Sequence, residues 1–244
     1  MKEIFFTFMF AFIIYAAGEA QDNNNNFCTK ADIGYVNITI GPVIPVGNFG
    51  NKDISNKSSG FAQTGYNFEL NGGYHLTKSI DINAKILYSL LNYDVSNLLN
   101  SYATQYPATS WTSLGEEWEL IGGLAGISFS HNFGKNFSGN VKILGGLMSS
   151  SMPEFSLKGS DGSTYTESKR SAKSFAYLFS VGGIYPIGHI IDLSADVEYL
   201  NASPTYTSIS QTFIHSGNLP VINTSDFNQS IGLLGFNIGV RLKF

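Results

Sequence analysis

Charged residues are scarce in this chain. Only 13% of its 244 residues are Asp, Glu, Lys or Arg, which is half of the ~25% that soluble domains usually carry. The formal net charge of −4 gives no basic footprint of the kind that binds a phosphate backbone. We therefore expect no nucleic-acid partner.

Cysteine and long apolar runs are nearly absent as well. The single Cys28 cannot form a disulfide within the chain, and it does not follow the small-residue box of a lipoprotein signal. The one continuous apolar run, residues 4–17, is shorter than the ~20 residues of a membrane-spanning helix. Because Lys2 precedes this run and small residues follow it, we predict a secretory signal peptide over residues 1–20.

Strict alternation of apolar and polar side chains marks the other end of the chain. Leu242, Val240, Ile238 and Phe236 form one face, and the residues between them are polar or glycine. A period of two is typical of a β-strand. A strand of a soluble sandwich would alternate in the same way, so the lipid-facing interpretation depends on the rest of the chain.

Eight segments are predicted as strands. They cover approximately residues 30–46, 62–76, 80–91, 117–132, 137–151, 174–186, 190–202 and 231–244. Tight turns of three or four residues join the second strand to the third, the fourth to the fifth and the sixth to the seventh. The other connections are long and rich in Ser, Asn, Thr and Gly, so short and long connections alternate without exception.

This alternation predicts a membrane β-barrel. Outer-membrane barrels have short periplasmic turns and long extracellular loops, and an apolar outer band replaces their charged surface. The aromatic fraction of 14% and the 26 glycines fit the same class. We therefore predict an all-β fold, an eight-stranded antiparallel up-and-down transmembrane β-barrel over residues 30–244, preceded by a periplasmic segment over 21–29. An even number of strands places both termini in the periplasm.

Pairing the hairpins predicts which side chains face the interior. Opposed residues of an antiparallel pair share one side of the sheet, so the apolar pairs Leu70 with Ile86 and Ile127 with Ile143 point outward. In strand one, Pro42 and Pro45 cannot donate to the ladder, which suggests a bulge or a frayed end. The charged residues expected inside the barrel are Glu69, Asp81, Lys85, Lys142, Asp192, Asp196, Glu198 and Arg241.

At this point the chain resembles the small eight-stranded outer-membrane barrel family of the OmpA/OmpX type, over residues 30–244. By that resemblance, the carboxyl terminus is similar to the signal that the barrel-insertion machinery reads. The residues that carry this similarity are Asn237, Gly239, Leu242 and Phe244. Phe244 can equally be the last aromatic residue of the periplasmic girdle. The family includes proteins of several activities, so the fold alone does not fix the function.

An eight-stranded barrel is only wide enough for side chains to fill its interior. Buried charges are costly unless they are paired, so we expect a salt-bridged plug, with Arg241 near Asp192 or Asp196. A structural or surface-interaction role follows. The alternative is a narrow small-solute channel. A second alternative is a secreted soluble β-barrel that binds an apolar ligand inside.

Enzymatic activity is not expected. Some barrels of this size modify lipids with a histidine and a serine, but Ser130 and His131 are neighbours and point to opposite faces. His75 faces Asp81 with no evident nucleophile. No catalytic residue, metal site or cofactor is implied.

The long loops remain as binding candidates, because binding residues often lie on loops held by a rigid scaffold. The second loop, 92–116, carries four aromatic residues among Ser, Thr and Asn, namely Tyr93, Tyr102, Tyr106 and Trp111. They could contact an external ligand or protein, or they could pack over the barrel mouth or extend the strands above the membrane. The expected partners are outer-membrane lipid, the insertion machinery and an unidentified extracellular ligand docked through loops 92–116 and 203–230.

Overall fold

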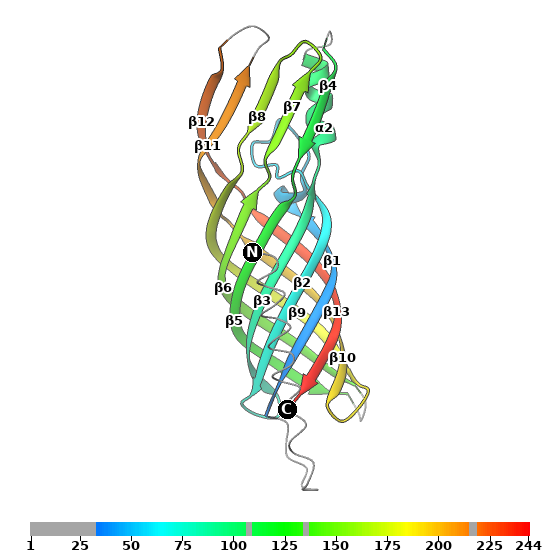
Figure 1. Cartoon of the computed structure of the whole chain (residues 1–244). Coiled ribbons are helices and arrows are strands. Elements are labelled where there is room, and N and C mark those ends of the chain that lie inside the picture. Colours follow the sequence, from blue (N-terminus) through cyan, green and yellow to red (C-terminus); the bar gives the residue numbers. More distant parts are fainter. Residues whose placement is uncertain (1–32, 106–108, 134–136, 215–218) are drawn as a thin grey trace.

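Eight antiparallel strands close into a barrel (Figure 1). The computed structural model describes residues 33–105, 109–133, 137–214 and 219–244. The signal-peptide segment, the segment 21–29 and Cys28 lie outside these residues. The barrel strands are β1 (Gly34–Val46), β2 (Ala62–His75), β3 (Ile80–Tyr93), β5 (Trp118–Asn132), β6 (Ser138–Met152), β9 (Arg170–Pro186), β10 (Ile191–Ala202) and β13 (Ile231–Lys243).

Each barrel strand pairs with its sequence neighbour, and β1 closes the barrel against β13. At the seam, the amide of Gly34 donates to the carbonyl of Phe244 over 3.1 Å and the amide of Phe244 donates to the carbonyl of Gly34 over 3.1 Å. The observed register pairs Leu70 with Ile86 and Ile127 with Ile143, as the sequence predicts. The prediction of an eight-stranded up-and-down barrel is confirmed.

Strand β1 is regular despite its two prolines. Its register does not shift along either ladder, with Pro42 opposite Tyr66 and Pro45 opposite Leu233, although the pairing with β2 ends at Val43. The predicted bulge is absent, whereas the predicted frayed upper end is present on the β2 side, where residues 44–46 have no partner in β2. In a closed barrel most of β1 is paired on both edges, so many ladder bonds hold the strand in register and the two missing amide donors do not shift it.

The short connections lie at the end of the barrel where the carboxyl terminus lies, and the long ones lie at the other end (Figure 1). Three of the four long connections are not irregular loops. Five of their segments form a second sheet above the barrel, in the order β12-β11-β8-β7-β4. These strands are β4 (Trp111–Gly115), β7 (Phe155–Gly159), β8 (Thr164–Glu167), β11 (Thr205–Ile214) and β12 (Val221–Asn228).

Two short helices complete the described elements. Helix α2 (Val95–Gln105) packs beside β4, and the 3-10 helix η1 (Gly47–Gly50) follows β1. Among the described residues, no helix combines the length and the apolar character that crossing a membrane requires. The upper sheet together with α2 is called the extension below.

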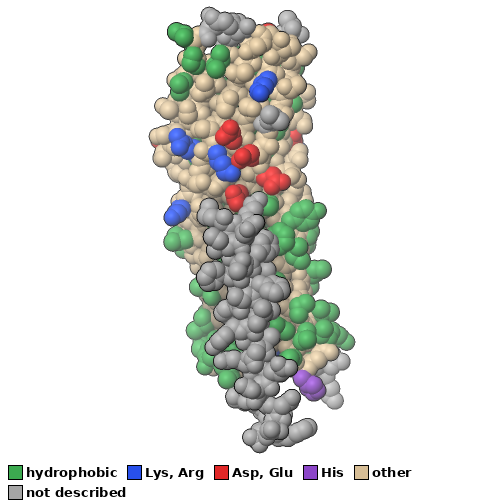
Figure 2. All heavy atoms as spheres, viewed as in Figure 1, with side chains coloured by type: hydrophobic (Ala, Val, Ile, Leu, Met, Phe, Trp, Pro, Cys, Tyr) green, Lys and Arg blue, Asp and Glu red, His purple; other side chains and the backbone are tan. Residues whose placement is uncertain are grey.

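The outer face of the barrel is apolar. Side chains that alternate with the buried positions are exposed, such as Ile82, Ile143 and Phe175, at 49%, 54% and 66%. Figure 2 shows hydrophobic side chains over the barrel, while charged side chains gather above them on the viewed face of the molecule. A water-facing surface would not expose so many large apolar groups, whereas the outer band of a membrane barrel does.

Candidate functional site

The lumen contains a layer of buried charges near the middle of the strands and toward their short-turn end. The eight charged residues expected inside the barrel all lie there, and each exposes 7% of its surface or less. Each of them points into the lumen, and its neighbours in the sequence point outward, as the alternation of side chains along a strand requires. Charges removed from water in this way need partners of opposite sign.

Lys85 crosses the lumen. Its ammonium nitrogen lies 2.8 Å from a carboxylate oxygen of Glu69 and 2.5 Å from one of Glu198. Glu69 comes from β2, the neighbour of β3, whereas Glu198 comes from β10, four strands away around the barrel. Thr39 donates a further hydrogen bond of 2.8 Å to Glu69. This bridge joins opposite walls of the barrel and blocks the lumen at its level.

A second ion pair lies close to the first. Lys142 of β6 donates to Asp196 of β10 over 2.9 Å. The wall beside Asp196 is Gly182, where an added Cβ would collide with the carboxylate. Glycine at this inward position therefore makes the room that Asp196 needs to reach Lys142.

Arg241 lies below these pairs. Its Nε is 3.9 Å from Asp192, so the expected proximity is present but the ion pair is long. The nearer cation of Asp192 is Lys243, at 3.0 Å. The Arg241 guanidinium instead stacks on the ring of Tyr35, 3.4 Å from its centroid, which is a cation–π contact.

The histidine and carboxylate at the short-turn end do not form a catalytic triad. His75 Nδ1 lies 2.5 Å from Asp81, as the register predicts. The Ser128 hydroxyl donates to the same carboxylate over 3.0 Å. In a triad the histidine stands between the carboxylate and the nucleophile, whereas here the carboxylate stands between the other two. The described residues also contain no group of three or more His, Cys, Asp or Glu that could hold a metal ion.

The upper half of the lumen is mainly apolar, contrary to the polar interior that the sequence predicts. In most strands, the inward positions are polar near the short-turn end and mainly apolar toward the extension. Trp118 closes this layer, with the ring of Phe49 from η1 at 5.1 Å and the ring of Tyr206 at 6.1 Å. The layer consists mainly of Val43, Leu87, Leu91, Leu120, Leu124, Leu144, Met148, Leu178, Leu200 and Leu233. A dry plug therefore lies above the charged layer.

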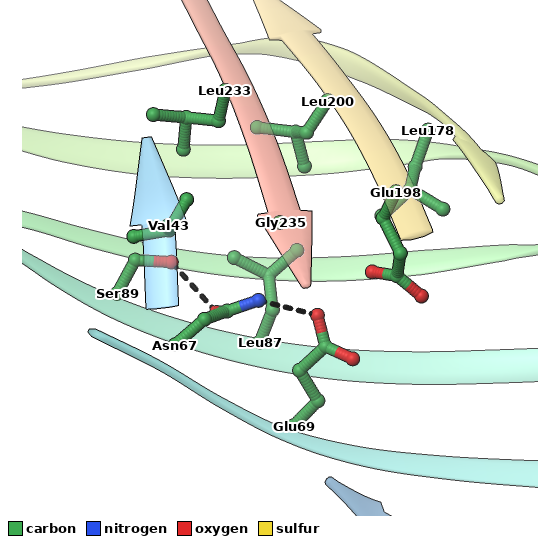
Figure 3. A pocket seen from close by; sticks show the side chains of 10 residues that line it. All are labelled: Val43, Asn67, Glu69, Leu87, Ser89, Leu178, Glu198, Leu200, Leu233 and Gly235. Atoms are coloured by element: carbon green, nitrogen blue, oxygen red, sulfur yellow. Dashed lines mark hydrogen bonds between the residues drawn. The ribbon is translucent and has the colours of Figure 1, made fainter. Parts of the chain in front are cut away.

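A small cavity separates the two layers (Figure 3). Its volume is about 10 Å³, which is room for about one water molecule. Glu198 lines it, and the second carboxylate oxygen of this residue is buried without a hydrogen-bond partner among the described residues. On the other side, Ser89 donates to Asn67 over 2.8 Å and Asn67 donates to Glu69. The cavity is too small to form a conducting path.

The aromatic residues of the second long connection have different surroundings. Tyr93 is mostly buried between Phe61 and Phe155, with ring centroids at 6.2 Å and 5.9 Å, so it packs over the barrel mouth. Trp111 begins β4 and is partly buried. Tyr102 lies in α2, Tyr106 lies outside the described residues, and the structure does not describe either side chain.

Asp94 ties the extension to the barrel. Its carboxylate accepts a hydrogen bond of 3.1 Å from the amide of Ser96, at the start of α2, and lies 2.6 Å from Lys52. Burial opposes the ionisation of Asp94, but the hydrogen bonds to its carboxylate and the charge of Lys52 outweigh it, so the pKa of this group lies below its ordinary value. The side chain therefore acts as an ionised cap of the helix.

The hairpin of β11 and β12 has a different surface from the rest of the extension. Five large hydrophobic side chains are exposed within the described connections at the long-loop end, and four of them belong to this hairpin. Leu219, Val221 and Ile222 expose 87%, 56% and 63%, and Ile214 exposes 36%. Exposed apolar groups on a polar scaffold are typical of an interaction site.

The proposed insertion-signal residues lie in and after β13. Asn237 is buried in the lumen, and Gly239 lies against the carbonyl of Ile38, where a Cβ would collide. Leu242 is partly buried, and the side chain of Phe244 is exposed beside Gly34. Phe244 thus lies at the seam and at the short-turn rim.

Comparison with solved structures relates this architecture to known proteins. A major outer membrane protein from Thermus thermophilus aligns over 86% of this chain and 99% of its own, with 9% identity and a TM-score of 0.50. The fold is that of an outer-membrane β-barrel. Neisserial surface protein A aligns over 86% of this chain and 97% of its own with 12% identity and a TM-score of 0.46. Ail, the attachment invasion locus protein of Yersinia pestis, aligns over 86% of this chain and 99% of its own, with 15% identity and a TM-score of 0.43.

At such identities the likeness extends to the fold alone. No protein-family model matches the barrel sequence, and no curated protein matches it. Its function is therefore argued from its own residues.

Proposed function

We propose that this chain is an integral outer-membrane barrel with a closed lumen, which works through the extension that it holds above the membrane. The apolar outer band supports the membrane location, since it would face acyl chains and the charged side chains above it would face water. The extension would then stand on the extracellular side and both chain ends on the periplasmic side.

The observation that carries a non-conducting role is the blocked lumen. A permeant solute would have to part the Lys85 bridge, and it would also have to pass the layer around Trp118 and Leu120. Separating Lys85 from its carboxylates inside the barrel would leave buried charges unpaired, at a cost of about 3–5 kcal/mol. The narrow-channel alternative therefore has no support from these residues.

The surface-interaction role is supported by the exposed hairpin. Large apolar side chains facing water cost free energy in the isolated protein, so their concentration on β11 and β12 favours a partner that covers them. No cofactor and no enzymatic reaction is part of this proposal, because the Ser128 hydroxyl donates to Asp81 and not to His75, as the nucleophile of a triad would.

Two experiments test the proposal. In a planar lipid bilayer the purified protein should give no steady single-channel steps, and regular steps would refute the closed lumen. On cells, deletion of residues 213–221 should reduce attachment to other cells or surfaces while the barrel remains folded in the membrane fraction. Unchanged attachment would refute the role of the hairpin. The matched control removes residues 160–163, the β7–β8 turn of the same sheet.

A further inference from the structure

The cavity between the two lumen layers is lined by a carboxyl group with an unused oxygen. Glu198 exposes 3% of its surface, and its Oε1 accepts a hydrogen bond from Lys85. Its Oε2 is buried and has no hydrogen-bond partner among the described residues. In Figure 3 no dashed line reaches Glu198, although the residue points toward other polar groups. A buried carboxylate oxygen without a donor is costly.

Glu69, on the other side of Lys85, has the opposite surroundings. Its Oε1 accepts a hydrogen bond of 2.5 Å from Asn67. Its Oε2 accepts hydrogen bonds of 2.8 Å from both Thr39 and Lys85. Three donors therefore meet this carboxyl group, whereas Glu198 meets Lys85 alone. Because donated hydrogen bonds favour the ionised form of a carboxyl group, Glu69 is the ionised member of the pair.

The charges in this part of the lumen do not balance if every carboxyl group is ionised. Three acidic and two basic side chains lie here, each exposed by 4% or less, namely Glu69, Asp196, Glu198, Lys85 and Lys142. From across the barrel, Glu198 is faced by Glu69, Lys85 and Lys142. Its partners on the adjacent strands, Ser180 and Gly235, carry no charge. One buried negative charge is thus left without a cation, which is unfavourable.

We propose that Glu198 holds a proton in the folded barrel, so that Lys85 bridges one ionised and one neutral carboxyl group. The carboxyl groups of Glu69 and Glu198 lie within hydrogen-bonding reach of each other. Two ionised carboxylates only accept hydrogen bonds, whereas a protonated carboxyl group also donates one. The proton makes Glu198 a donor with Glu69 as its acceptor, and it removes the surplus charge.

This proton links the stability of the barrel to pH. Unfolding releases it to the solvent, because a glutamic acid side chain in water is ionised above about pH 4.3. The folded chain then binds one proton more than the unfolded chain, so the free energy of unfolding falls as the pH rises. One proton corresponds to an increase in the unfolding equilibrium constant of up to about tenfold per pH unit.

Replacing Glu198 by glutamine tests the proposal, since glutamine has nearly the shape of the neutral acid. The full chain is refolded into lipid vesicles and unfolded with urea at several values between about pH 5 and 8. The unfolding constant of the unmodified protein should rise with pH more steeply than that of Glu198→Gln, by up to about tenfold per pH unit. At neutral pH the variant should be at least as stable as the unmodified protein.

Glu69→Gln is the matched variant, because it makes the same change at the ionised member of the pair. The amide group of glutamine cannot accept the hydrogen bonds that Asn67 and Thr39 direct at this position. The unfolding constant at neutral pH should therefore rise by about tenfold or more. A difference between two such similar substitutions separates the charge state of Glu198 from a general loss of packing.

Infrared spectroscopy detects the proton directly. The spectrum of the unmodified protein minus that of Glu198→Gln, both in neutral buffer, should contain the carbonyl band of a protonated carboxylic acid. The corresponding difference for Glu116→Gln, at an exposed carboxylate, should contain only the bands of an ionised group.

Three results would overturn the proposal. The first is a difference spectrum for Glu198→Gln that contains carboxylate bands alone. The second is the same dependence of the unfolding constant on pH in this variant and in the unmodified protein. The third is failure of Glu198→Gln to insert while Glu69→Gln inserts, because glutamine should replace a neutral carboxyl group more easily than an ionised one. None of these results bears on the surface role of the extension, which does not depend on the charge of Glu198.

Discussion

Replacing Lys85 by methionine tests the bridge that closes the lumen. The Lys85 side chain is 1% exposed, and its ammonium group contacts Glu69 at 2.8 Å and Glu198 at 2.5 Å. Methionine has a similar length, so the change leaves little empty volume and mainly leaves two carboxylates without their shared cation. Removing one partner of a buried ion pair costs about 3–5 kcal/mol. We expect the free energy of unfolding to fall by at least that amount at pH 7.

The assay is equilibrium unfolding by urea in lipid vesicles, followed by tryptophan fluorescence and by the gel mobility of the folded barrel. Lys78→Met, in an exposed turn, is the matched control and should change the free energy of unfolding by less than about 0.5 kcal/mol. Adding Glu69→Gln and Glu198→Gln to Lys85→Met should recover most of the loss, because no charge is then left unpaired. A loss below about 1 kcal/mol for Lys85→Met alone would refute the bridge as described.

Three further predictions concern other parts of the chain. Trp118→Ala should lower the free energy of unfolding by about 3–5 kcal/mol yet leave planar bilayers without single-channel steps, since the Lys85 bridge remains below. Asp94→Ala should increase hydrogen exchange at the start of α2 by an amount equivalent to about 1 kcal/mol. Because the pKa of Asp94 is lowered, the unmodified protein should keep this protection until the pH falls below 3.8, and loss of the protection at a higher pH would contradict the ionised cap. Phe244→Ser should slow insertion by the assembly machinery in cells, and insertion at the normal rate would argue that Phe244 is only a rim residue.

The strands and their pairing could be predicted from the sequence because each hairpin sets its own register. Once the turn at Thr77 is recognised, the register of the hairpin places Leu70 opposite Ile86. The period of two then assigns each further pair of the hairpin to the inner or the outer side of the sheet. The polar positions of the lower lumen, such as Asp81 and Lys85, could be assigned for the same reason.

The apolar upper lumen could not be recognised in this way. In segments such as Leu90–Leu91 and Leu120–Ile121, both faces of the strand are apolar, so the alternation that separates inside from outside is lost. The sequence pattern therefore predicted a polar interior throughout. The inward positions at the start of β5 could have indicated it, because Trp118, Leu120 and Leu124 share one face of that strand and all three are apolar.

The contact between Lys85 and Glu198 was also beyond the reach of hairpin pairing. Register arguments relate neighbouring strands, whereas β3 and β10 face each other across the barrel. The strands of the extension were missed because they are short and rich in Ser, Thr and Asn, which equally suit loops. Their ladders depend on partners far apart in sequence, as when Gln211 of β11 pairs with Glu167 of β8.

The most direct test of the whole account is photolabelling of the unmodified protein in lipid vesicles with a small apolar carbene precursor that dissolves in the bilayer. Two sets of apolar side chains should behave differently when the labelled residues are mapped by mass spectrometry. Ile82, Ile143 and Leu193 should carry the label, because they point away from the barrel axis. Leu87, Leu144 and Leu200 should remain unlabelled, because they fill the lumen. Labelling of the second set, with protection of the first, would show that the lumen-filling side chains face the lipid and would contradict the account.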